Sequence, residues 1–171
     1  MTGTIGDAHL GLLLLKQPEL AGKWKLSEDE VAFLIGRYRE PEPRNAIAIP
    51  LRNLASAAID VSDGLVGDVG KLAAVSHVGA VIEAARVPLS PSARKAVESD
   101  PKLLEALLTG GDDYEIVASV PEASASSFET EIGGKEETIT QIGRIEERDG
   151  VKVLGEGGRP LKLNHKGFAH F

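Results

Sequence analysis

The chain has 171 residues, a net charge of −7 and no cysteine. This length suits one domain that is large enough to bury a hydrophobic core. The excess of acidic residues argues against a basic surface that binds nucleic acid, and the lack of cysteine excludes disulfides, thiolate catalysis and cysteine zinc sites. No apolar run approaches the ~20 residues that span a bilayer. We therefore expect a cytoplasmic protein with neither a membrane nor a nucleic-acid partner.

Helices are predicted along the first third of the chain. The leucine spacing over residues 5–16 is typical of a helix with a broad apolar face, and Asp7 is positioned to cap it. Residues 27–30, Ser-Glu-Asp-Glu, form a capping box, in which the serine bonds the third helical amide and the last glutamate reaches back. This box predicts a second helix that ends near Arg39, and residues 44–54 predict a further short helix.

Three arginines, Arg37, Arg39 and Arg44, gather where the second helix is expected to end. Positive side chains near the C-terminal end of a helix interact favourably with its dipole. We interpret the three arginines as charges that stabilise the C-terminal end of this helix. The alternative is that these arginines contact an anion.

The remainder of the chain alternates between strand and helix patterns. Gly67 and Gly70 each weaken the helix expected over 65–76 by roughly 1 kcal/mol, so we expect another element to pack tightly against them. The Asp149–Gly150 dipeptide is typical of a hairpin turn and predicts that the strands on either side of it pair. The pattern indicates an α+β domain with a sheet of about four main strands and helices packed on it. Strands are expected at 80–85, 114–120, 138–145 and 151–154, and helices at 91–98, 101–108 and 121–128.

The segment Ile59-Asp60-Val61-Ser62-Asp63-Gly64-Leu65 joins the end of an expected strand to the start of an expected helix. Asp60 and Asp63 place two carboxylates at this corner, with the Ser62 hydroxyl between them. Such an oxygen-rich corner suits Mg²⁺, and a magnesium-bridged phosphate is the natural ligand because carboxylates alone repel phosphate. The alternative is that Ser62 or Asp63 only caps the helix and that Asp60 is a solvated turn residue.

A second acidic segment, Gly110-Gly111-Asp112-Asp113-Tyr114-Glu115, opens the strand expected at 114–120. Its three acids lie within four consecutive residues and concentrate negative charge at one end of the strand. A turn with ordinary polar residues is the alternative. Taken with the first motif, the segment favours the interpretation of that motif as a functional site over helix capping alone.

The two motifs together resemble the C-terminal half of the thiamine-monophosphate kinase family, within the aminoimidazole-ribonucleotide synthetase-like superfamily. The resemblance is carried by residues 58–65 and 109–116 and runs from end to end of the chain. It implies a mixed sheet flanked by helices in one domain, residues 1–171. It also implies that the family's N-terminal half, with its ATP and Mg²⁺ site, is absent. Further stretches that agree are 2–7, 12–15, 37–44 and 167–171.

The resemblance implies phosphoryl transfer from ATP to thiamine monophosphate, giving thiamine diphosphate, with Mg²⁺ between the two polyanions. Asp60 and Asp63 match metal-binding aspartates of the family, and Ser62 matches a residue at the nucleotide phosphates. Asp112 matches an acidic position that binds the amine-bearing substrate, where the family more often has the longer glutamate. Phe168 matches an aromatic residue that packs against the substrate; the alternative is that it tucks into the core. The rest of the second motif is interpreted as structural: Asp113, Tyr114 and Glu115.

Rival interpretations remain open. Aminoimidazole-ribonucleotide synthetase, selenophosphate synthetase and hydrogenase-maturation proteins share the superfamily fold, although both motifs fit the thiamine enzyme better. Alternatively, the chain is a binding module that is catalytically silent without the ATP half, or a structural domain whose acids merely cap helices. The expected partners are thiamine monophosphate, ATP and the missing N-terminal half. Alone, the chain is expected to be inactive and monomeric or weakly self-associating, because the resemblance implies dimers built largely by the absent half.

Overall fold

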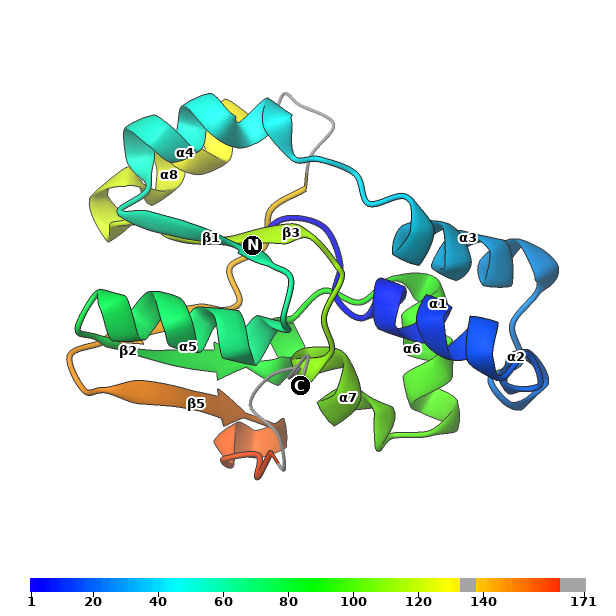
Figure 1. Cartoon of the computed structure of the whole chain (residues 1–171). Coiled ribbons are helices and arrows are strands. Elements are labelled where there is room, and N and C mark those ends of the chain that lie inside the picture. Colours follow the sequence, from blue (N-terminus) through cyan, green and yellow to red (C-terminus); the bar gives the residue numbers. More distant parts are fainter. Residues whose placement is uncertain (133–137, 164–171) are drawn as a thin grey trace.

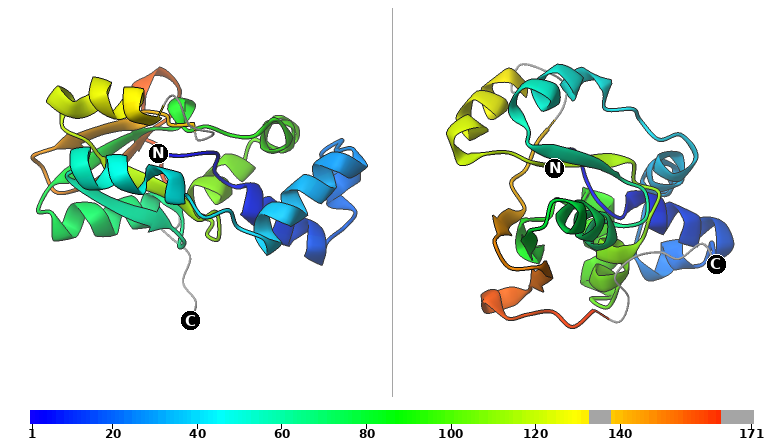
Figure 2. Two further views of the ribbon diagram at one scale, coloured as in Figure 1. Left: turned by 90° about the horizontal axis from the view of Figure 1, so that it is seen from above. Right: turned by 60° about the vertical axis from the view of Figure 1, so that its left-hand side comes forward.

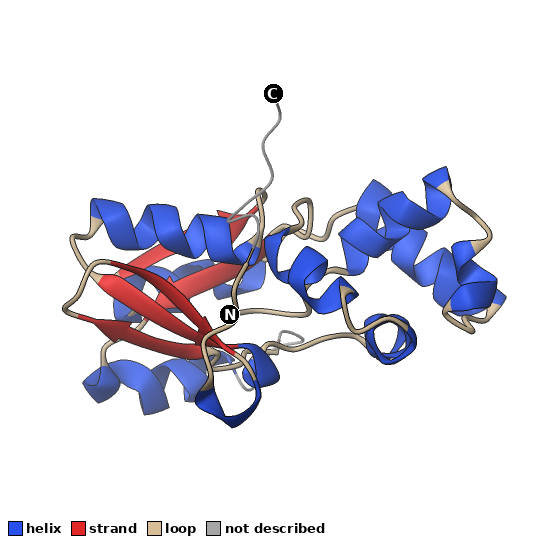
Figure 3. Ribbon diagram, turned by 90° about the horizontal axis from the view of Figure 1, so that it is seen from below, coloured by secondary structure: helices blue, strands red, loops and turns tan. Residues whose placement is uncertain are grey.

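The computed structural model describes residues 1–132 and 138–163 and has an α+β architecture (Figures 1 and 2). Strands gather at one end of the molecule, and the other end is built from helices (Figure 3). None of the helices in these two ranges is long and apolar enough to cross a membrane. The helices are α1 Asp7–Lys16, α2 Leu20–Lys23, α3 Glu28–Arg39, α4 Ala48–Leu54, α5 Leu65–Val75, α6 Pro91–Ser99, α7 Leu103–Thr109 and α8 Glu122–Ile132, with short 3-10 turns at Asn45–Ile47, Ala84–Arg86 and Glu156–Gly158. The strands are β1 Ala57–Val61, β2 Gly79–Glu83, β3 Glu115–Ser119, β4 Gly143–Glu146 and β5 Gly150–Leu154.

The strands divide into two sheets. β1 and β3 pair antiparallel, which places Asp60 opposite Ile116. β2 is the central strand of the other sheet, with β4 antiparallel on one side and β5 parallel on the other. Helices flank both sheets (Figure 1). The predicted class, α+β with a mixed sheet flanked by helices, is therefore confirmed, and the strands are shared between two sheets.

The hairpin predicted at Asp149–Gly150 is wrong. β4 and β5 do not pair with each other, because β2 lies between them. The bend at 147–149 instead crosses the start of β2, where a Cβ on Gly79 would lie 1.7 Å from the Arg148 carbonyl oxygen. β2 is buried along most of its length, so this apolar strand takes the central place. The dipeptide marks a change of chain direction, but it does not determine which strands become neighbours.

Three apolar clusters hold these layers together. Helix α5 packs against both sheets, and its Leu65 and Val69 share one core with residues of β1, β2, β3 and β5. Helices α4 and α8 lie on the other side of the β1–β3 pair (Figure 1), where Phe128 and Ile132 are buried. The helical end of the molecule surrounds Trp24, which is 1% exposed. The capping box predicted at 27–30 is confirmed at the start of α3.

Gly70 on α5 does not mark tight packing. A Cβ on Gly70 would have its nearest neighbour at 3.7 Å, the side chain of Val151, which is ordinary van der Waals contact. Gly67 and Gly70 line a cavity of about 820 Å³ between α5, β5 and residues 160–163. The tight packing predicted from the glycine pair is therefore wrong at Gly70.

A Cβ has room at Gly70 but not at Gly79. Alanine substitutions at these two positions are therefore predicted to change the free energy of unfolding in opposite directions. Gly70→Ala should raise the free energy of unfolding by about 0.5–1 kcal/mol, because alanine is the better helix former and has room there. Gly79→Ala should lower it by about 1–3 kcal/mol, because the new methyl group would overlap a backbone carbonyl. Urea unfolding of the two variants and the wild type measures both values. Equal effects of the same sign would contradict the packing described for β2 and α5.

Candidate functional site

The two acidic motifs lie side by side, although about fifty positions separate them in the sequence. The backbone N–H of Asp112 donates to the carbonyl oxygen of Ser62 at 2.9 Å, and the N–H of Tyr114 donates to the carbonyl oxygen of Val61 at 2.9 Å. The loop that precedes β3 is thus bound to the chain that leaves β1. Both motifs contribute to one corner of the molecule.

Glycines allow this close approach of two backbones. A Cβ on Gly64 would lie 2.4 Å from the carbonyl oxygen of Thr109, and a Cβ on Gly111 would lie 2.3 Å from the carbonyl oxygen of Ser62. Gly64 also has a φ of 105° and is the N-cap residue of α5, with no side-chain cap. The alternative that Ser62 or Asp63 caps this helix is therefore wrong, because the chain enters α5 through a conformation that favours glycine.

The carboxylate of Asp63 forms an ion pair with Lys71, two turns along α5. The same ammonium group contacts the Asp68 Oδ1 at 2.8 Å, and Asp68 Oδ2 accepts a hydrogen bond of 2.9 Å from the backbone N–H of Asp63. Hydrogen bonds to Asp63 and Asp68 raise the pKa of Lys71. Sequence reasoning missed Asp68 and Lys71. Their spacing of three on the helix expected over 65–76 was an available signal.

The other predicted site residues lie around the same corner. Asp60 is exposed on β1, and Ser62 and Asp112 are each half-buried, with a φ of 72° at Asp112. Phe168 lies outside the described residues. Within the ranges 1–132 and 138–163, no three His, Cys, Asp or Glu side chains are grouped so that they could hold a metal ion by themselves.

These residues fit a magnesium site that a ligand completes. Mg²⁺ is commonly held by one or two carboxylates together with substrate phosphates, and keeps several of its waters. Asp60 and Asp63 supply carboxylates at the corner, which is the kind of donor that Mg²⁺ prefers. A complete protein cage is not needed for such an ion, so the donor set is suitable for a metal that arrives with a phosphate.

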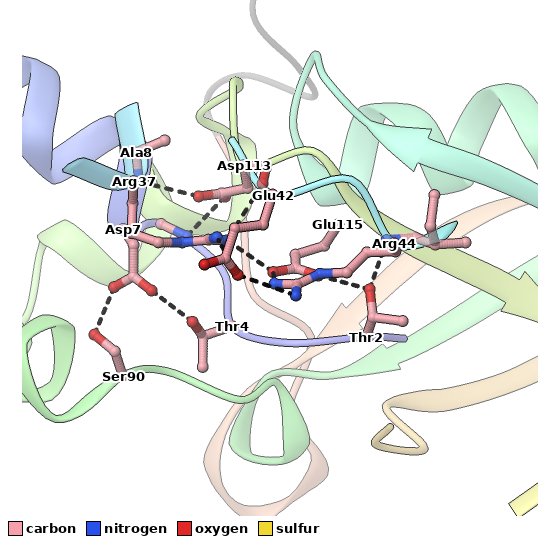
Figure 4. A network of polar contacts seen from close by, with 12 residues as sticks. Thr2, Thr4, Asp7, Ala8, Arg37, Glu42, Arg44, Ser90, Asp113 and Glu115 are labelled. Atoms are coloured by element: carbon pink, nitrogen blue, oxygen red, sulfur yellow. Dashed lines mark hydrogen bonds and ion pairs between the residues drawn. The ribbon is translucent and has the colours of Figure 1, made fainter. Parts of the chain in front are cut away.

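Beside the corner, Glu115 is fully buried and neutralised by two arginines (Figure 4). Arg44 makes two contacts with its carboxylate, at 2.8 Å through Nε and 2.6 Å through Nη2, and Arg37 makes one at 2.8 Å. The Thr2 hydroxyl donates to the same group at 2.6 Å. The structural role predicted for Glu115 is confirmed. Arg37 and Arg39 lie in the last turn of α3, as the helix-end interpretation expects. Arg44 lies beyond the helix, so the interpretation is wrong for that residue. Both Arg37 and Arg44 bind an internal carboxylate.

Asp113 is the second buried acid of this motif and holds the start of α1 (Figure 4). Its oxygens accept hydrogen bonds from the backbone N–H groups of Gly6, at 2.7 Å, and Ala8, at 3.1 Å. Gly6 is the N-cap residue, so the cap predicted at Asp7 is wrong. Burial raises the pKa of Asp113 to about 7, and the nearby Asp7 contributes in the same direction. Burial also raises the pKa of Asp7, which accepts hydrogen bonds from Ser90 and Thr4.

A family model described as AIR synthase related protein, C-terminal domain, matches residues 2–156. The chain belongs to this family. Among curated relatives, the thiamine-monophosphate kinases of Caulobacter vibrioides and Escherichia coli K12 are each 35% identical to it, over 99% and 100% of the chain. The chain covers 47% and 51% of those two relatives. It therefore spans about half the length of the curated relatives that it matches.

Solved structures agree with this membership of the AIR synthase related family. The thiamine-monophosphate kinase of Stenotrophomonas maltophilia superposes with a TM-score of 0.80 at 32% identity, covering 94% of this chain and 49% of that one. The AaThiL complex with AMPPCP and TMP has a TM-score of 0.77 at 32% identity, covering 99% and 50%. Escherichia coli HypE, at 23% identity, shares the fold. The resemblance to the thiamine-monophosphate kinase family is confirmed.

The buried ion pair predicts that two glutamates that contact the same arginines contribute very differently to the free energy of unfolding. Glu115→Gln should lower the free energy of unfolding by about 3–5 kcal/mol, because it leaves two guanidinium groups partly buried without their counter-ion. Glu42→Gln should cost less than about 1 kcal/mol, because the Glu42 side chain is 69% exposed although it contacts Arg37 and Arg44. Chemical denaturation of both variants measures the difference. A small effect of Glu115→Gln would contradict a structural role for the pair.

The raised pKa of Asp113 predicts a pH-dependent stability. Between about pH 4 and pH 7, the folded state keeps a proton on Asp113 that the unfolded state has released, so this group lowers stability as the pH rises. Asp113→Asn cannot ionise, so its stability relative to wild type should rise by roughly 1–3 kcal/mol over that range. Denaturation at several pH values tests this, with the exposed Asp29→Asn as control. A difference from wild type that does not change with pH would contradict it.

Proposed function

We propose that this chain is the C-terminal half of a thiamine-monophosphate kinase, and that it takes part in phosphoryl transfer from ATP to thiamine monophosphate. The observation that carries the proposal is the joining of the two acidic motifs at one corner, in a chain that curated thiamine-monophosphate kinases match along 99% and 100% of its length. A similar structure, the AaThiL complex, contains TMP and AMPPCP, an analogue of ATP. The HypE structures support only the shared fold, so the thiamine reaction is the better-supported activity.

In this proposal, the chain's own residues prepare the corner for two anionic ligands. Asp60 and Asp63 hold Mg²⁺, which supplies charge neutralisation between the phosphates when it is bound. Ser62 contacts the nucleotide phosphates from the same turn. Asp112 faces the cationic, amine-bearing part of thiamine monophosphate, and Phe168 packs against that substrate.

Phosphoryl transfer of this kind depends on positioning and on electrostatic stabilisation. The attacking group is an anionic phosphate, so the chain needs no general base. Because the structure offers no complete metal cage within 1–132 and 138–163, the proposal includes a partner: the N-terminal half of the enzyme, which provides most of the nucleotide site. We also propose that the activity is cytoplasmic, which is in keeping with a sequence that has no cysteine for disulfides.

The proposal is tested by combining the chain with the N-terminal half of a thiamine-monophosphate kinase such as the Escherichia coli enzyme. Thiamine diphosphate should form only when both halves, ATP and Mg²⁺ are present. Asp63→Asn should reduce the rate on the order of 100-fold, because a direct metal ligand is lost. Asp112→Ala should weaken thiamine monophosphate binding by roughly tenfold to hundredfold, because a charged contact is lost.

The exposed Asp29→Ala, on α3 and away from the corner, is the matched control and should leave both quantities unchanged. Size-exclusion chromatography establishes whether the two halves associate. A stable complex of the two halves that forms no thiamine diphosphate would refute the kinase assignment and favour a silent binding module. Equal rates for wild type and Asp63→Asn would refute the metal role of that residue.

A further inference from the structure

One cation of the chain already occupies the acidic corner. The Lys71 ammonium group bridges the carboxylates of Asp63 and Asp68. Its side chain starts two turns into α5 and reaches back to the start of the helix, which is the direction that helical side chains take. The corner is therefore neutralised in part by the protein itself.

The two carboxylates that share Lys71 differ in their surroundings. Asp68 is 1% exposed and uses both oxygens, one for Lys71 and one for the backbone N–H of Asp63. Removing the counter-ion of a buried carboxylate strongly destabilises the folded protein. The folded state therefore keeps Lys71 on Asp68. Asp63 is 31% exposed and Lys71 is 52% exposed, and ion pairs of that kind contribute little to stability. Asp63 is thus the partner whose contact with Lys71 solvent or another cation can replace at the lower cost.

We propose that Lys71 is a positioning residue that competes with the divalent cation for Asp63. When the cation takes Asp63, Lys71 stays on Asp68, and the N–H that it withdraws from Asp63 becomes available to an oxygen of the incoming phosphate. An ammonium group has three donors, so this exchange of partners needs no movement of α5. The inference rests on the proposed metal role of Asp63.

The exchange has a consequence for the order of binding. A free cation must displace Lys71 from Asp63 and offers it no new partner in return. A cation that arrives with its phosphate provides that partner, so the net cost of displacement is smaller. Lys71 therefore disfavours binding of the bare ion and favours the ion–phosphate complex.

The test is calorimetric titration of Mn²⁺, as a probe for Mg²⁺, into the 171-residue chain without phosphate. Lys71→Met should bind Mn²⁺ about fivefold to tenfold more tightly than wild type, since a unit charge about 4 Å away is removed. Lys152→Met is the matched control. Like Lys71, Lys152 is 52% exposed and lines the cavity beside α5, and it pairs with Glu146. Its substitution therefore removes the same charge but leaves the contact between Lys71 and Asp63 in place. Lys71→Arg keeps the charge and should bind Mn²⁺ like the wild type.

Two further measurements make the outcomes distinct. Circular dichroism on heating confirms that each variant is folded, and Asp63→Asn added to Lys71→Met should abolish the gain in affinity. If wild type binds Mn²⁺ through Asp63 but Lys71→Met binds no more tightly than Lys152→Met, the competition is refuted while the metal site stands. If Mn²⁺ binding does not depend on Asp63 in any variant, both the metal site and the role of Lys71 are refuted.

Discussion

The buried carboxylate of Glu115 is the interaction on which the arrangement of this chain depends. A charge with no exposed surface is stable only if its partners are in place. Those partners are Thr2, Arg37 and Arg44, which come from the N-terminal segment, the end of α3 and the residue that precedes the 3-10 turn before α4. The first residue of β3 is therefore satisfied only when three distant segments converge on it. Gly3 belongs to the same constraint, since a Cβ there would lie 2.1 Å from the Glu115 Oε1.

This convergence also positions the candidate site. Once β3 starts at Glu115, the preceding loop runs beside the end of β1, and its amides donate to the carbonyl groups of Val61 and Ser62. The close approach at Gly64 and Gly111 leaves no room for side chains between the two backbones. The two motifs therefore occur together because they form one structure, in which each segment supplies part of the surface of the other.

What the sequence predicts well here is local. The capping box of α3 needs only residues 27–30, and the fold class follows from apolar spacing over single elements. The hairpin at Asp149–Gly150 was wrong because the turn signal contains no information about β2, which lies about seventy positions earlier and takes the place between β4 and β5. The caps expected for α1 and α5 are wrong because carboxylates and hydroxyls suit an extended N-cap, whereas Gly6 and Gly64 enter their helices with positive φ.

The candidate site was predicted in part for the same reason. Its position at the two motifs could be inferred from local composition, because acids and glycines gather there. The partners of Glu115 could not be inferred from the sequence. Arginines near residue 40 look the same locally whether they meet a helix dipole, a free anion or, like Arg44, a carboxylate 71 residues away. One signal of the burial of Glu115 was present in the sequence. Glu115 lies two positions before the apolar Val117, so both share one face of the strand, and both are buried in β3.

Burial divides the acids of the two motifs, together with Asp68 of α5, into two groups. Asp68, Asp113 and Glu115 are each no more than 2% exposed, and the protein occupies them with backbone amides, arginines or Lys71. Asp60, Asp63 and Asp112 lie at or near the surface of the same corner. The first group cannot bind a ligand without unfolding the structure that it supports, and the second contributes much less to that structure. In the proposed function, such a corner gains or loses its cation at the surface while the buried charges beneath it keep both motifs in place.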